Sequence, residues 1–181
     1  KPSNVLVNSL GAPVLADFGI AAAVLDEGDP ETIAMSVPWS APEVLQERVS
    51  GSVPSEIWSL GATLYTLLAG RSPFEKPDRA DNTREHLTQR IIRAKYPPLP
   101  FSGMPPVVDE ILATAMQRDP ARRFPSMAAF GERLRHVRDR LPCLPLRLGH
   151  LGERCLRECP RRPEIAVGAL VRHLFTLLPR R

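Results

Sequence analysis

Cysteine, lysine and long apolar runs are all scarce in this sequence. Its three cysteines all follow residue 142, and an odd number confined to one segment argues against a disulfide framework. The longest apolar stretch near the end, residues 165–178, contains Arg172 and His173 and is too short to span a bilayer comfortably. We therefore expect no transmembrane segment in this chain. Only three of the 24 basic residues are lysines, so the remaining positive charge comes from arginine.

The net charge of +4 hides an uneven distribution along the chain. Residues 1–140 carry 16 basic and 17 acidic side chains, whereas residues 141–181 carry eight arginines and three glutamates. The body therefore gives no electrostatic reason to expect nucleic-acid binding. We expect one domain over residues 1–140, followed at 141–181 by a Pro/Arg-rich linker and an amphipathic tail.

The hydrophobic pattern predicts a mainly α-helical body with one small β-hairpin. Two short apolar runs, residues 5–7 and 13–16, flank a turn and form the hairpin, so its second strand leads into Asp17. Helices are predicted over residues 54–69, 83–94, 106–117 and 126–141. The first of these has hardly any polar face, which predicts a buried central helix ending at Gly70.

Asn4 and Asp17 stand on either side of the predicted hairpin, which brings both to one edge. An amide and a carboxylate supply the oxygen ligands that Mg²⁺ prefers. Lys1 is suited to hold a transferring phosphoryl group as a point charge. These three residues predict a site for handling a nucleotide triphosphate. The irregular acidic segment 20–40 that follows has a length typical of functional or disordered loops.

Five short motifs follow one another along the chain: KPSN (residues 1–4), DFG (17–19), SVPWSAPE (36–43), IWSLG (57–61) and DPARR (119–123). In kind and order they resemble the motifs of eukaryotic-like protein kinases. The segment LLAGRSPFE at residues 67–75 is most similar to bacterial serine/threonine kinases.

This resemblance implies the fold of a kinase C-terminal lobe over residues 1–140, with the N-terminal lobe absent from this chain. The family's catalytic aspartate would stand two residues before Lys1, and its glycine-rich loop further upstream. The chain opens on Lys1 without an initiator methionine. We expect it to be the rear part of a larger catalytic domain, and the 181 residues alone to be inactive.

The resemblance also implies roles for residues near the nucleotide. Asn4 and Asp17 correspond to the two Mg²⁺ ligands, and Lys1 to the catalytic lysine near the γ-phosphate of ATP. Ser3 is expected beside the bound nucleotide, and Leu6 on the floor of the adenine pocket.

Further roles implied by the resemblance fall on the activation segment and the core. Ser36 corresponds to a hydroxyl that links this segment to the catalytic loop and shapes the substrate site. Phosphorylation of Thr32 stays open, because four nearby acids also supply negative charge. Glu43 and Arg123 are expected to form a buried ion pair. Glu56 stands where the family has an aspartate that braces the catalytic loop.

The predicted function is a serine/threonine protein kinase that uses ATP and Mg²⁺ to phosphorylate proteins. We expect a cytoplasmic location, with membrane tethering of the full-length protein left open. The alternatives are a degenerate or truncated lobe that binds partners without turnover, and a scaffold whose Arg-rich tail docks another protein. A solvated linker is favoured over a membrane-binding tail. A metal site in the tail is disfavoured because its spacing matches no zinc pattern; its residues would be His150, Cys155, Cys159 and His173.

Overall fold

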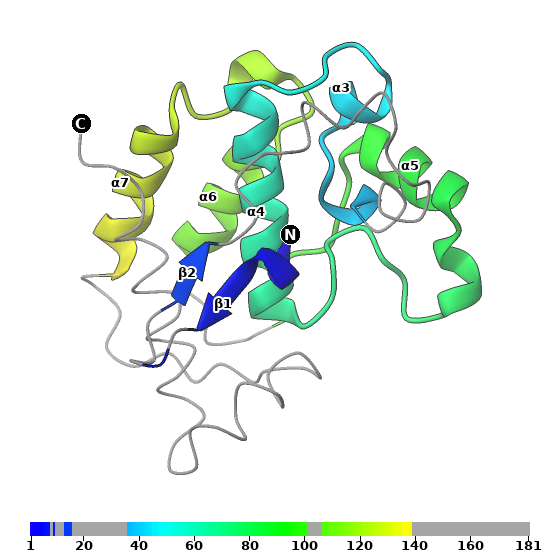
Figure 1. Cartoon of the computed structure of the whole chain (residues 1–181), viewed down its shortest axis with the longest axis horizontal. Helices are drawn as coiled ribbons and strands as arrows, with labels where there is room; N and C mark the ends of the chain where they lie inside the picture. Colours follow the sequence, from blue (N-terminus) through cyan, green and yellow to red (C-terminus); the bar gives the residue numbers. More distant parts are fainter. Residues whose placement is uncertain (8, 10–12, 16–35, 101–105, 139–181) are drawn as a thin grey trace.

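The computed structural model describes residues 1–7, 9, 13–15, 36–100 and 106–138 (Figure 1). These residues form a mainly helical body with one small hairpin, which confirms that part of the prediction. Asp17, Thr32 and the tail 141–181 lie outside the described residues. The elements, in chain order, are η1 (Pro2–Asn4), β1 (Val5–Val7), β2 (Pro13–Leu15), η2 (Val37–Trp39), α3 (Pro42–Leu45), α4 (Val53–Ala69), η3 (Arg79–Asn82), α5 (Arg84–Arg93), α6 (Pro106–Ala115), η4 (Pro120–Arg122) and α7 (Met127–Arg138).

The predicted hairpin is formed by β1 and β2, which pair in antiparallel fashion. Val5 lies opposite Leu15, and Leu6 lies opposite Val14. The first residue of β1 thus faces the last residue of β2. Because of this register, the chain leaves β2 at the same end of the hairpin where η1 leads into β1.

The helix α4 is the buried centre of the body, as its sequence predicts. Ser52 caps its first turn: the Ser52 hydroxyl accepts from the Ser55 amide at 3.2 Å, and the Ser55 hydroxyl accepts from the Ser52 amide at 2.8 Å. The helix ends at Gly70, whose φ of 75° lies in the left-handed region, which glycine adopts without steric strain because it has no Cβ atom. Figure 1 shows α4 between α6 on one side and α3 and α5 on the other.

The remaining helices direct apolar residues into one shared core, in which α6 packs against α4, α7 against α6, and α5 against α3 and η2. In α5 the Thr83 hydroxyl accepts from the His86 amide at 3.3 Å and so caps the first turn. Its apolar residues Leu87, Ile91 and Ile92 would all be expected to face inward. Leu87 and Ile91 are buried, but Ile92 is only half-buried, so the inward face of α5 is narrower than its apolar residues alone suggest.

Gly61 lets α4 and α6 approach each other closely. A Cβ atom at this position would lie 2.9 Å from the Ala115 Cβ and 3.3 Å from the Met116 Cγ. Gly61→Ala is expected to lower the free energy of unfolding by about 1–3 kcal/mol, because the added methyl group forces the two helices apart. Urea denaturation measures the change.

Gly51 provides the matched control for this substitution, because a Cβ there would meet no atom within 4 Å. Gly51→Ala is expected to change the free energy of unfolding by less than about 0.5 kcal/mol. Equal effects of the two substitutions would show that the α4–α6 approach is not limited by Gly61.

Two features of the described part bear on the expectations for the tail and the membrane. None of its helices combines the length and the apolar character needed to cross a bilayer. Nor does it contain a group of three or more histidine, cysteine, aspartate or glutamate side chains suited to a metal ion. The four tail residues considered as metal ligands lie beyond the part of the chain that the structure describes.

Candidate functional site

The residues expected at the nucleotide lie on η1 and the adjoining strand β1. Within η1 the Asn4 amide donates to the Lys1 carbonyl at 2.9 Å, and the Ser3 hydroxyl donates to the Asn4 Oδ1 at 3.4 Å. Pro2 is buried, and η1 packs against α4. The central helix therefore supports the short turn that carries Lys1, Ser3 and Asn4. Figure 1 shows the N-terminus beside α4.

Leu6 is the next expected site residue along the chain. Its side chain is 51% exposed, which makes it one of three large apolar side chains that are exposed among the described residues. On β1 it follows Asn4 by two positions and pairs with Val14. The structure thus places an exposed apolar side chain two positions after Asn4.

Ser36 opens the segment that leads from the undescribed residues to α3. Its carbonyl accepts from the Trp39 amide at 3.1 Å and from the Ser40 hydroxyl at 3.1 Å. Trp39 then donates its indole N–H to the Thr66 hydroxyl of α4 at 3.0 Å. Val37 is only 2% exposed. Ser36 is therefore a half-buried residue at the start of a turn anchored on α4, the same helix that supports η1.

Glu43 and Arg123 form a buried ion pair between α3 and the residue after η4. The Arg123 guanidinium donates to both carboxylate oxygens of Glu43, at 2.6 and 2.8 Å. The Arg123 side chain is 0% exposed and the Glu43 side chain is 10% exposed. Such two-pronged contact fits the planar guanidinium to the planar carboxylate and fixes the orientation of both. This is the pair that the resemblance implies.

The Arg123 guanidinium has three further partners that the sequence analysis did not foresee. It donates to the Gln117 carbonyl at 2.8 Å and to the Pro54 carbonyl at 2.9 Å. It also lies 4.9 Å from the centre of the Trp58 ring, a cation–π contact. One side chain therefore holds together α3, the first turns of α4 and the segment after α6.

Glu56 stands at the position of the expected brace. Its side chain is exposed, two positions before the buried Trp58, and this side chain makes no hydrogen bond to the residues that the structure describes. The family's aspartate at this position would be shorter by one methylene. The expected brace therefore stays a prediction.

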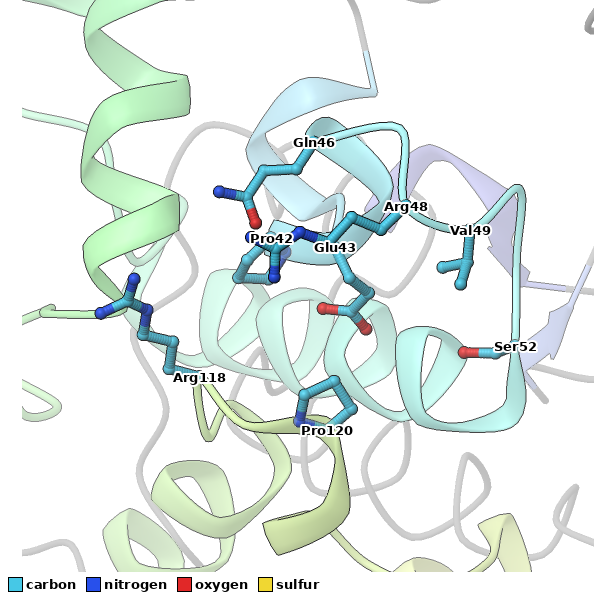
Figure 2. A pocket seen from close by; sticks show the side chains of 8 residues that line it. All are labelled: Pro42, Glu43, Gln46, Arg48, Val49, Ser52, Arg118 and Pro120. Atoms are coloured by element: carbon cyan, nitrogen blue, oxygen red, sulfur yellow. The ribbon is translucent and has the colours of Figure 1, made fainter.

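The sequence analysis also missed a surface pocket at the end of α3, shown in Figure 2. Its volume is about 300 Å³, and Arg48 and Arg118 are among its lining residues. No motif of the sequence marks these two arginines, because they are 70 positions apart and belong to different connections. Only the fold brings them to one pocket.

Comparison with known proteins identifies the family. A model of the protein kinase domain matches residues 1–134. Serine/threonine-protein kinase PknK of Mycobacterium tuberculosis is 37% identical over 163 residues, which cover 82% of this chain and 14% of that protein. PknL of the same species is 32% identical over 144 residues, covering 78% and 35%. Ribosomal protein S6 kinase alpha-4 of Homo sapiens is 33% identical over 126 residues, covering 68% and 16%.

The chain thus spans a small part of the length of each of these relatives. By name these relatives are serine/threonine-protein kinases of a bacterium and a ribosomal protein kinase of an animal. The resemblance that the five motifs carry is thereby confirmed. This chain belongs to the protein kinase domain family, and it is similar to eukaryotic-like serine/threonine kinases of bacteria.

Proposed function

We propose that residues 1–140 form the C-terminal lobe of a serine/threonine protein kinase domain, completed by an N-terminal lobe upstream of Lys1. In this proposal the full-length protein transfers the γ-phosphoryl group of ATP to serine and threonine hydroxyls of proteins. The observation that carries it is the turn Lys1–Asn4, which is held on the buried helix α4 beside a hairpin. Family membership and the names of the relatives support the same reaction.

Two oxygen-bearing residues are proposed to hold Mg²⁺. Asn4 ends η1 immediately before β1, and Leu15, two residues before Asp17, pairs with Val5, the neighbour of Asn4. An amide oxygen and a carboxylate are the hard ligands that suit this ion. When bound, Mg²⁺ would neutralise the phosphate charge as the phosphoryl group moves.

The remaining residues would bind and orient the nucleotide and the substrate. Lys1 is proposed to contact the γ-phosphate, Ser3 to lie beside the nucleotide, and Leu6 to contact the adenine ring with its exposed side chain. Ser36, in its turn on α4, is proposed to help shape the substrate site. Thr32 stays a candidate for phosphorylation. A cytoplasmic location, where ATP is available, belongs to the same proposal.

A phosphoryl-transfer assay tests this function. The full-length protein is incubated with radiolabelled ATP, Mg²⁺ and peptides that differ only in offering serine, threonine or tyrosine. We expect label on the serine and threonine peptides, none on the tyrosine peptide, and loss of transfer when EDTA removes the metal.

A protein that binds ATP or peptide without any transfer would overturn the catalytic proposal in favour of a non-catalytic kinase lobe. The exposed Glu56, in place of the bracing aspartate, is the observation that keeps this alternative in view. Glu56→Asp in the full-length protein distinguishes an active kinase with a weakened brace from a non-catalytic lobe. Only the weakened brace predicts a higher rate of phosphoryl transfer in the variant.

A further inference from the structure

The pocket at the end of α3 has a positively charged rim. Figure 2 shows the Arg48 side chain reaching back across the end of α3, and Arg118 on the side of the pocket away from Val49 and Ser52. Arg118 also lines a second cavity of about 710 Å³ between the end of α5 and α6. That cavity adds Arg93 and Lys95. The two cavities adjoin at Arg118 and together carry four cationic side chains.

These four cations have no ion-pair partner among the residues that the structure describes. The ion pairs found there join Lys76 to Asp81, Arg123 to Glu43 and Arg135 to Glu132. Two acids line the cavities. Glu43 is neutralised by Arg123, whereas Asp109, which accepts a hydrogen bond from the Leu99 amide at 3.1 Å, keeps its negative charge. Four cations against this one carboxylate leave the rim with a net positive charge for a ligand to balance.

The backbone under Arg48 is fixed by the way α3 ends. Glu47 has a left-handed φ of 56°, the Glu47 amide donates to the Val44 carbonyl at 3.0 Å, and the Arg48 amide donates to the Glu43 carbonyl at 2.9 Å. These two bonds form a Schellman motif, which also satisfies the carbonyl groups at this helix end. Arg48 therefore leaves α3 in a defined direction.

The backbone beside Arg118 is fixed by the Nε group of Arg123. The carbonyl of Gln117, its neighbour, accepts from Arg123 at 2.8 Å. Both arginines of the pocket thus rise from backbone that is already ordered, so a ligand need order only their side chains. Lower ordering cost leaves more of the interaction energy for affinity.

The wall of the pocket has apolar parts as well as charged ones. Pro42 and Pro120 line it, as does Val49, whose side chain is 38% exposed. A volume of about 300 Å³ is at the lower end of the range of ligand pockets. Carboxylates beside an apolar side chain match this combination, and acidic peptide segments carry both.

Charge balance favours a peptide over a nucleic acid. Residues 1–140 hold 17 acidic side chains against 16 basic ones, so the positive rim is local. Nucleic-acid binding draws on many phosphate contacts over an extended basic surface. A few paired carboxylates suffice for a peptide.

We propose that the pocket between Arg48 and Arg118 docks an acidic peptide segment of a partner protein, whose carboxylates pair with the two guanidinium groups. The neighbouring Arg93 and Lys95 extend the same surface along the peptide. This docking goes beyond the proposed kinase reaction and does not depend on phosphoryl transfer.

Fluorescence anisotropy of the full-length protein with a labelled peptide of glutamate and leucine tests the proposal. A peptide with glutamine in place of glutamate and a single-stranded DNA oligonucleotide serve as comparison ligands. We expect the acidic peptide alone to bind. The double variant Arg48→Glu/Arg118→Glu is expected to weaken its binding about tenfold or more, because reversal replaces two attractions by repulsions.

Arg133→Glu is the matched control, since Arg133 is an exposed arginine of α7 away from both cavities. It is expected to change the affinity by less than about twofold, and Arg48→Lys/Arg118→Lys to retain most of it. Thermal unfolding checks that every variant is folded. Equal weakening by Arg133→Glu, equal binding of the glutamine peptide, or preferential binding of DNA would each overturn the proposal.

Discussion

Asp17→Ala is expected to lower the rate of phosphoryl transfer by the full-length protein on the order of a thousandfold. The physical reason is loss of the only carboxylate proposed to bind Mg²⁺, which leaves the amide of Asn4 as the one remaining proposed ligand. A neutral oxygen alone holds a hard divalent cation weakly. Steady-state transfer to a serine peptide at saturating ATP measures the effect.

The magnesium concentration dependence separates metal binding from loss of folding. Asn4→Ala removes the other proposed ligand and leaves the Asp17 carboxylate in place. This variant should therefore stay active but need a higher Mg²⁺ concentration for half-maximal activity. Glu110→Ala, on the exposed side of α6, is the control for removal of an acid and should leave activity within about twofold. Near-normal activity of the Asp17 variant would contradict the metal site.

Arg123→Met is expected to lower the free energy of unfolding by about 3–5 kcal/mol. Methionine keeps much of the length of the side chain, but it leaves the Glu43 carboxylate buried without its cation. The carbonyl groups of Gln117 and Pro54 lose their donors in the same change, and an unsatisfied buried acceptor is costly. Urea denaturation followed by circular dichroism measures the loss.

Arg135→Met is the matched control, because Arg135 pairs with Glu132 on the same helix. The Glu132 side chain is 75% exposed, and exposed pairs contribute only about 0–1 kcal/mol. The double variant Glu43→Leu/Arg123→Met should recover part of the stability lost in Arg123→Met, since it removes the buried charge. A loss in Arg123→Met no larger than that in Arg135→Met would contradict the role of the pair.

Local patterns predicted the helices and the hairpin because both depend on neighbouring residues. The apolar run 54–69 predicted α4, and Gly70 its end. The five motifs predicted the family, now shown by the match over residues 1–134. These motifs also implied the partnership of Glu43 and Arg123 across the chain.

Contacts between distant residues without a motif could not be predicted in the same way. Nothing in the sequence distinguishes Arg48 and Arg118 from the other arginines. Their shared pocket exists only when folding brings α3 and η4 together. The left-handed backbone of Glu47 could not be predicted either, because a residue with this conformation at a helix end is usually glycine. The cation–π contact of Arg123 with Trp58 depends on the same tertiary packing.

The separation between the two members of the buried ion pair has a consequence during protein synthesis. Glu43 precedes Arg123 by 80 residues. At roughly 5–20 residues per second, translation therefore leaves Glu43 without its partner for about 4–16 seconds. In that interval α3 has no cation to permit burial of its carboxylate. Burial of the Glu43 carboxylate against its cation therefore waits until α4, α6 and η4 have been made, although α3 precedes all three in the chain.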